Sequence, residues 1–415
     1  MIAATAPVQR SSRAKVMAVD PSGQIRDLPR AALIDLIQPG DLVVANDAAT
    51  IPASLSGVHL TSRRPIEVRL AGVPSLDPHN REFSAVVFGE GDFHTRTEDR
   101  PQPPSLAKGD QLQLGPLSAK ILHLLDHPRL VLLEFDHFRD ELWAGLAHHG
   151  RPIQYSHTPV PLALWDVWTP IAGPPVAFEP PSAGFALSWQ LVTEMRVAGA
   201  QFKTITHVAG LSSTGDSELD ERLPFDEPYH VPRGTADAIN QARSSGRRII
   251  AIGTTVVRAL EHAVHEGKIA AGENLATERI GVGTRLKVVD ALLSGTHEPG
   301  TSHYELLRAF LTDAELERLT TELNMREYRT HEFGDSVLVE RTFNKLAERH
   351  KVRQERVPLP IADQRAPVGS QARHLSGSIA LQCSSDEALL RDHGSLVNAT
   401  TNFTTSILGK DLKPK

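Results

Sequence analysis

The sequence predicts a layered α/β protein with a small β-barrel domain inserted into it and a disordered C-terminal tail. Strand patterns fill residues 66–135, helices and strands alternate between about residues 150 and 345, and the Pro-, Gly- and Ser-rich sequence beyond shows no clear period. Alternating strands and helices indicate a layered α/β domain, whereas closely spaced short strands are typical of a barrel or curled sheet. We therefore expect an α/β domain at 1–56 and 150–345, a barrel at 57–149 and a flexible tail at 346–415.

The bulk composition is that of an ordinary globular protein. The 415 residues are 40% hydrophobic and 23% charged, and 44 basic against 50 acidic residues leave a net charge of −6. A globally basic surface for nucleic acid is therefore absent, so any RNA contact must use a local patch. Arg63-Arg64 and Arg247-Arg248 are basic pairs that could serve, although such pairs are more often simply solvated.

The cysteine content and the apolar pattern favour the cytoplasm. A single cysteine, Cys383, rules out a disulfide within the chain and a metal site of the CxxC type. No apolar run approaches the roughly 20 residues that span a bilayer, and the N-terminal residues lack the apolar core of a secretory signal. We expect a cytoplasmic protein with no membrane contact.

The first part of the chain is dominated by strand patterns. A short apolar strand, Leu42 to Ala45, ends at Asn46-Asp47, which is turn chemistry. Residues 140–150 predict a helix closed by Gly150. Between them, Pro, Gly, Asp and Asn clusters separate five predicted strands, at residues 66–72, 82–89, 110–115, 117–125 and 129–135.

Beyond residue 150 the pattern alternates. Three helices are predicted. The first spans residues 188–200, the second has Thr235 as its N-cap and ends at Gly246, and the third begins at Thr254. Ser302 and Glu305 form a capping-box pattern ahead of a further apolar helix. Strands are predicted at residues 202–210, 247–253 and 336–343, and residues 286–293 form another apolar segment.

The most informative local unit is a buried strand that runs into Gly253-Thr254-Thr255 and then into a helix containing Arg258. Free N–H groups at a helix N-terminus, with two hydroxyls beside them, favour an anionic group such as phosphate or carboxylate. The alternative is that a threonine merely caps the helix, and the pattern alone favours that simpler interpretation.

A second unit is the loop at residues 294–302, which holds His297 among Gly, Pro, Ser and Thr. A loop histidine can act as an acid or a base near neutral pH, although a surface histidine in a turn is the commoner case. Gly334-Asp335 stands at the start of a strand, where the aspartate could bind a hydroxyl or hold a cation, although such a residue is more often part of a turn.

Two more loops are candidates for ligand contact. Pro181-Ser182-Ala183-Gly184 is a tight turn that lets backbone approach a ligand, or a simple helix start. Residues 207–215, followed by Glu227, form a strand-end loop that suits a ligand or an ordinary connection. The chain contains no P-loop, GxGxxG, HExxH or GxSxG motif, so these units alone indicate only an α/β enzyme with a polar site of strand-end loops.

In their order, these units resemble the S-adenosylmethionine:tRNA ribosyltransferase-isomerase family of queuosine synthesis. The resemblance is collinear over roughly residues 8–340. The strongest match, to the family's GTTSVRTLE, is made by Gly253, Thr254, Thr255, Val257, Arg258, Leu260 and Glu261. Further matches are residues 40–47 to GDLLVxND, residues 181–184 to PTAG, His207-Val208 to LHVGAGTF, residues 287–290 to FKVVD, His297 and Pro299 to TNFHLP, and Tyr328-Arg329 with Gly334-Asp335 to YRFFSYGD.

The chain departs from the family at several polar positions, as a diverged member would. The histidine of the family's GLHF is Ala186 here, the two histidines of HxMHxE are Arg222 and Phe225, and the asparagine of TNFH is Gly295. Three hypotheses stay open: the family's ribosyl transfer, a diverged paralogue acting on another S-adenosylmethionine- or nucleoside-type substrate, and a non-catalytic RNA- or ligand-binding protein.

The resemblance implies that the ribosyl unit of S-adenosylmethionine is transferred to the aminomethyl-deazaguanine base of tRNA and isomerised, giving epoxyqueuosine. It implies S-adenosylmethionine as co-substrate, tRNA as partner and neither metal nor other cofactor, and we expect a monomer. By elimination among the matched histidines, His297 is the predicted acid–base residue, with Asp335 or Glu227 as its supporting carboxylate. The predicted substrate-binding residues are Asn46, Asp47, Ser182, Gly184, His207, Gly253, Thr254, Thr255, Arg258 and Arg329.

Overall fold

The computed structural model describes residues 1–9 and 11–342, and the predicted tail lies outside these residues. Among them, nine strands form one mixed sheet in the order β18-β14-β13-β4-β15-β19-β21-β2-β3. Its centre is parallel, because β4 pairs with both β13 and β15, and β15 pairs with β19. These four strands are β4 (Leu42–Asn46), β13 (Gln201–His207), β15 (Ile249–Ile252) and β19 (Ala291–Gly295).

Helices cover both faces of this sheet. Successive side chains of a strand point to opposite faces, so each central strand contributes to two apolar clusters. Leu42 and Val44 of β4 belong to one apolar cluster, and Val43 and Ala45 to another. The first cluster is covered by α5 (Arg233–Ser244), α6 (Thr254–His262), α7 (Ser302–Leu307) and α8 (Asp313–Met325). The second is covered by the 3-10 helices η1 (Arg30–Leu36) and η3 (Ser182–Ala186) and by α3 (Trp189–Val197).

Five further strands, joined mainly by antiparallel pairings, complete the sheet on either side of its parallel centre. They are β14 (Glu227–Val231), β18 (Gly272–Ala276), β21 (Ser336–Glu340), β2 (Lys15–Val19) and β3 (Ile25–Pro29), of which β2 pairs in parallel with β21. Short pieces join these elements: β1 (Ile2–Ala3), β5 (Ala49–Thr50), β12 (Pro175–Ala177), β16 (Val264–His265), β17 (Lys268–Ile269), β20 (Arg329–Thr330), α2 (Leu164–Val167) and α4 (Ser217–Asp220).

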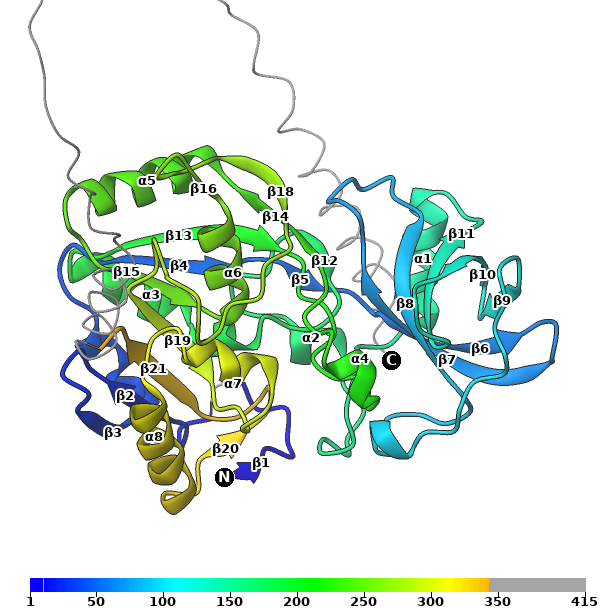
Figure 1. The fold of residues 1–415 in the computed structure, drawn as a ribbon, viewed down its shortest axis with the longest axis horizontal. Helices are drawn as coiled ribbons and strands as arrows, with labels where there is room; N and C mark the ends of the chain where they lie inside the picture. Colours follow the sequence, from blue (N-terminus) through cyan, green and yellow to red (C-terminus); the bar gives the residue numbers. More distant parts are fainter. Residues whose placement is uncertain (10, 343–415) are drawn as a thin grey trace, which may run out of the picture.

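The inserted domain is a closed six-stranded barrel that lies beside the α/β domain (Figure 1). Its strands are β6 (Ser54–His59), β7 (Arg64–Gly72), β8 (Glu82–Phe88), β9 (Gln111–Leu114), β10 (Leu117–Leu124) and β11 (Leu130–Phe135), with the 3-10 turn η2 (Thr97–Asp99) between β8 and β9. Leu142 and Leu146 of α1 (Arg139–His149) pack into the same core. The predicted α/β fold with an inserted barrel is confirmed.

One barrel strand, β6, was not among the five predicted strands. Its sequence includes Gly57, and glycine is depleted in strands. The structure shows why glycine stands there: a Cβ on Gly57 would lie 2.2 Å from the carbonyl oxygen of Gln113 on β9. Two backbones therefore approach closely where the barrel closes, which a sequence pattern does not show.

Two predicted helix caps are wrong. Helix α5 begins at Arg233, so Thr235 lies inside it, and its hydroxyl donates to the carbonyl of Thr204 rather than accepting a backbone N–H. The residue that caps α7 is Thr301, not Ser302, because the Thr301 hydroxyl accepts the N–H of Tyr304. In the described part of the chain, no helix is both long and apolar enough to cross a membrane.

Gly57→Ala tests the close approach in the barrel. The added methyl group meets backbone and the side chain of Leu114, so we expect a loss of about 1–3 kcal/mol in the free energy of unfolding, measured by urea denaturation. Gly234→Ala in α5 is the matched control, because a Cβ there meets nothing within 4 Å. Equal stability of the two variants would contradict the prediction.

Candidate active site

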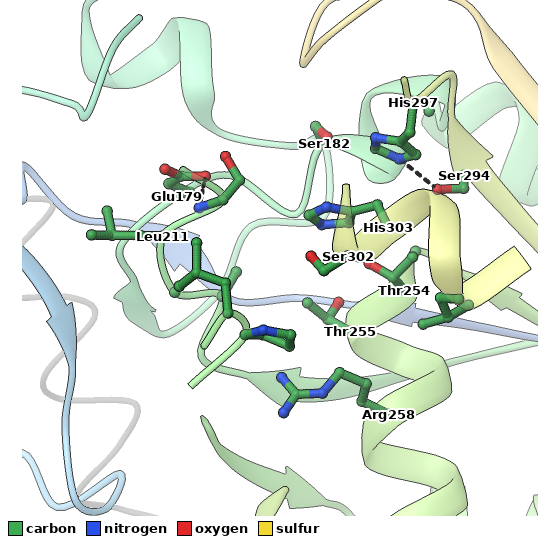
Figure 2. Close-up of a pocket in the computed structure, with 18 of the residues that line it drawn as sticks. Glu179, Ser182, Leu211, Thr254, Thr255, Arg258, Ser294, His297, Ser302 and His303 are labelled. Carbon is green, nitrogen blue, oxygen red and sulfur yellow. Dashed lines mark hydrogen bonds between the residues drawn. The ribbon is translucent and has the colours of Figure 1, made fainter. Parts of the chain in front are cut away.

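A pocket of about 290 Å³ lies at the carboxyl ends of the parallel strands. Its wall contains Gly253 from the end of β15, Gly295 from the end of β19, and residues 209–212 from the loop after β13. In open α/β sheets, ligands bind in the crevice outside the carboxyl ends of the strands. Residues 179–183, the start of α6, the segments at 220–227 and 279–280, the loop before α7 and α7 itself also line the pocket. Figure 2 shows side chains from several of these segments converging on one space.

The N-terminus of α6 forms the floor of the pocket. Gly253 precedes the helix with φ 99°, a left-handed conformation that favours glycine, and its N–H donates to Leu293. Thr254 and Thr255 of the first turn line the pocket, and neither caps the helix through its side chain. The first turn of α6 thus borders the cavity, and the N–H groups that a helix leaves unpaired at its N-terminus suit a carboxylate or phosphate.

Arg258, one turn further along α6, is held by protein groups on every side. Its guanidinium forms an ion pair with Glu227 and donates to the backbone carbonyls of Phe225, Ala276 and Glu278. Glu227 also accepts the N–H of Gly210, and burial raises its pKa against the opposing charge of Arg258. Both side chains line the pocket, so the pair shapes its floor instead of presenting a free cation.

His297 lies in the pocket wall, stacked on His303. The ring centroids are 4.6 Å apart, and Nε2 of His297 lies 3.0 Å from the hydroxyl of Ser294. Burial, together with the neighbouring His303 and His331, lowers the pKa of His297 well below its ordinary value. Burial also lowers the pKa of His303, to about 4. Both imidazoles are therefore neutral at neutral pH, which leaves His297 a free lone pair but makes it a weaker base than an exposed histidine.

Several predicted site residues lie beneath the pocket instead of in its wall. Asn46 clamps the backbone of His207, accepting its N–H and donating to its carbonyl, each at 2.9 Å. Asp47 accepts the hydroxyl of Thr206, and burial raises its pKa. The ring of His207 is fully buried, with Nε2 3.6 Å from Glu227. Of the Ser182–Gly184 turn, Ser182 lines the pocket, whereas Gly184 packs against Thr169.

The structure does not bring Asp335 and Arg329 to the pocket. The two carboxylate oxygens of Asp335 accept the backbone N–H groups of Lys15 and Arg329, so this side chain anchors β2 and the segment before β21. Arg329 is exposed. Glu227 is engaged by Arg258, so neither predicted carboxylate contacts His297. Among residues 1–9 and 11–342, no three His, Cys, Asp or Glu side chains gather as metal ligands.

Comparison with known proteins identifies the family. A family model described as queuosine biosynthesis protein matches residues 1–339. The chain belongs to this family. A member from Geobacter sulfurreducens, named S-adenosylmethionine:tRNA ribosyltransferase-isomerase, is 30% identical over 364 residues, covering 82% of this chain and 96% of the relative. The identically named protein of Thermosynechococcus vestitus is 30% identical over 313 residues, covering 74% of this chain and 84% of the relative.

A crystal structure of S-adenosylmethionine tRNA ribosyltransferase from Thermotoga maritima is also similar to this chain. It aligns with a TM-score of 0.43 at 22% identity, covering 81% of this chain and 96% of that one. The family membership confirms the resemblance that the collinear motifs indicate, including those at 253–261 and 287–290.

Two polar residues of this family member's pocket, Glu179 and His303, were missed by sequence reasoning. Glu179 stands between Phe178 and Pro180, where nothing in the pattern distinguishes it from a loop carboxylate. His303 lies one residue after Ser302 in the helix start, and its position relative to His297 depends on how the loop folds back. The available signal for His303 is that it follows His297 by six residues, and this spacing is only a weak indication that the two rings meet.

The Arg258–Glu227 pair has a testable energetic consequence. Arg258→Met leaves a buried carboxylate without its cation, which should lower the free energy of unfolding by about 3–5 kcal/mol. Adding Glu227→Gln to that variant removes the uncompensated charge, so the double variant should be more stable than Arg258→Met alone. Chemical denaturation of the three proteins measures this, and a strictly additive double variant would contradict a coupled pair.

Proposed function

We propose that this protein transfers the ribosyl unit of S-adenosylmethionine to the aminomethyl-deazaguanine base of a tRNA and isomerises it, giving epoxyqueuosine. The family match over residues 1–339 carries the proposal. Support comes from relatives named for this reaction and from a polar pocket at the carboxyl ends of the parallel strands. S-adenosylmethionine serves as co-substrate, and the chemistry needs no further cofactor.

The reaction begins at the carbon beside the sulfonium. A sulfonium acidifies the neighbouring ribose C–H, so a base removes that proton first. Adenine then leaves, assisted by an acid or hydrogen-bond donor, the amine of the tRNA base adds, the sugar rearranges, and methionine departs. The protein's contribution is to position the reactants and to supply groups of suitable pKa.

The pocket suits this substrate in two respects. The backbone N–H groups and hydroxyls of Thr254 and Thr255 are matched to the carboxylate of the methionine portion. On another side of the pocket, neutral His297 is the proposed base, because its lowered pKa keeps an imidazole lone pair available at neutral pH. Ser294, not a carboxylate, is the side chain that orients its Nε2.

The tRNA must approach from the open side of the pocket by a local contact. Of the two basic pairs, Arg247-Arg248 is poorly placed to provide it, because Arg248 forms ion pairs with Asp41 and Glu340. Arg63 and Arg64 are exposed at the turn between β6 and β7 of the barrel. We propose the barrel as the part that contributes the basic contact.

A second function, the same S-adenosylmethionine chemistry on a different acceptor, is favoured by one observation. Ala186 and Phe225 occupy positions where the family motif has histidine. Phe225 contributes only its carbonyl, to Arg258, and its ring packs near the barrel core. Loss of these donors changes which acceptor groups can be held, while the pocket around Gly253 and His297 is retained.

The direct test is to incubate the protein with S-adenosylmethionine and tRNA carrying the aminomethyl-deazaguanine base. Adenine and methionine should be released in equal amounts, with epoxyqueuosine formed in the tRNA, as measured by chromatography and mass spectrometry. Release of adenine with some other acceptor, and none with this tRNA, would establish the second function. No release with any nucleoside or RNA acceptor would contradict both.

His297→Gln tests the proposed base. Turnover should fall by about 10²–10⁴-fold, because glutamine cannot take up the proton, while affinity for S-adenosylmethionine changes little. Calorimetry measures that affinity, and adenine release measures the turnover. Turnover within about threefold of the unsubstituted protein would remove His297 from this role.

A further inference from the structure

Glu179 is a buried carboxyl group in the pocket wall, and the proposed function gives it no role. It follows β12, and its backbone N–H donates to the carbonyl of Ala209 in the loop after β13. The residue is 6% exposed and lines the pocket. Figure 2 shows Glu179 on one side of the space, with His297 and His303 on the other.

The carboxyl group is held in a defined orientation. The hydroxyl of Tyr155 donates to its Oε1 at 2.5 Å, and the N–H of Ser212 donates to its Oε2 at 3.1 Å. Tyr155 is fixed in turn, since its hydroxyl accepts the N–H of Ser213 at 3.2 Å. Each carboxyl oxygen keeps a further lone-pair position, so a proton or a ligand can still be bound.

The charged groups around Glu179 come from three parts of the chain. Glu332, before β21, is an anion whose repulsion disfavours a second negative charge, and it accepts a hydrogen bond from His157 at 3.0 Å. His157 stacks on His331. Arg69 of β7 lies over the ring of Tyr155, 5.5 Å from its centroid, and is itself paired with Glu67.

Within the described residues, Glu179 has no ion-pair partner of its own, in contrast to Glu227. Burial raises its pKa to about 7, with repulsion from Glu332 acting in the same direction and Tyr155 and Ser212 opposing it. A carboxyl group with this pKa holds its proton for a large part of the time at neutral pH.

We propose that Glu179 is the general acid that protonates adenine as it leaves. This inference rests on the proposed function. As the glycosidic C–N bond breaks, its electron pair passes to adenine, the O–H bond of Glu179 breaks, and an N–H bond forms on adenine. The resulting carboxylate takes a proton from solvent before the next turnover, so the step needs no oxidant, reductant or further reactant.

The two sides of the pocket then have complementary roles. On one side the surroundings keep His297 neutral and able to take up a proton, and on the other they keep Glu179 protonated and able to release one. A pair of groups whose environments move their pKa values apart is the usual sign of an acid and a base in one site. Glu179 contacts the leaving group, and Tyr155 acts through it as a positioning residue.

The first experiment compares Glu179→Gln with the unsubstituted protein. Glutamine keeps the shape but carries no acidic proton, so adenine release should fall by about 10²-fold or more, while the Kd for S-adenosylmethionine stays within about threefold. Glu317→Gln, an exposed change on α8, is the matched control and should leave turnover unchanged. The loss should shrink with an S-adenosylmethionine analogue whose adenine carries an electron-withdrawing substituent, because that base leaves with less need of a proton.

The second experiment uses the pH profile, which a merely structural role would not move. Because the acid must be protonated, kcat should fall as the pH rises through the pKa of Glu179, about 7. Tyr155→Phe removes a hydrogen bond to the ionised form, so it should shift this falling limb to higher pH. Glu332→Gln removes a repelling anion, so it should shift the limb to lower pH.

The outcomes separate this inference from the proposed function. If the unsubstituted protein releases no adenine, the proposed function fails. If it does, and Glu179→Gln retains turnover within about threefold, or loses affinity and turnover in equal measure, the assignment of Glu179 is overturned. If Glu179→Gln does not fold, the shifts of Tyr155→Phe and Glu332→Gln in opposite directions support the assignment, and shifts in the same direction or none overturn it.

Discussion

The parallel pairing of β4 with both β13 and β15 is the constraint on which the pocket depends. Asn46 of β4 lies opposite Ile205 of β13, and Ala45 lies opposite Ile252 of β15, so these strands end at one edge of the sheet. The pairing of β15 with β19 brings Gly295 to the same edge. Loops and helix ends from residues 179 to 306 therefore line one cavity. A slip of one residue in any of these pairs would turn the side chains of that strand to the opposite face.

Many of the family's motif residues serve this arrangement and not the chemistry. The amide of Asn46 continues the link between β4 and β13 past the end of the ladder by clamping the backbone of His207. Glu261 of α6 accepts the N–H groups of residues 287–289, which ties that helix to the segment ahead of β19. Asp335 similarly anchors β2. These side chains bind backbone groups of distant segments, so motif residues beyond the pocket wall hold the surrounding elements in place.

The electrostatics of the pocket divide its polar residues into two groups. Arg258 and Glu227 form a buried ion pair in the floor, and the positive charge of Arg258 still helps to lower the pKa of His303. His297, His303 and Glu179 have no such compensation, and burial holds all three toward their neutral forms. The contact of Arg69 with Tyr155 links the buried charges of the barrel to the carboxyl group in the pocket. The barrel is thus part of the environment that sets the proton affinity of Glu179.

The sequence by itself determined the fold class, the inserted barrel, the strands β4, β13, β15 and β21 of the sheet, and the family. It could do so because apolar periodicity and collinear motifs are local properties of the chain. It also located Gly253-Thr254-Thr255 and His297, since glycine, threonine and histidine in strand-end loops are chemically distinctive. Only the tertiary structure decided that Asp335 accepts backbone N–H groups and that Arg258 forms an ion pair with Glu227, because such partners lie on distant segments of the chain. The same holds for Glu179: its neighbours Tyr155, Ser212 and Glu332 come from three loops, and burial among them, which no local pattern encodes, is what makes it an acid.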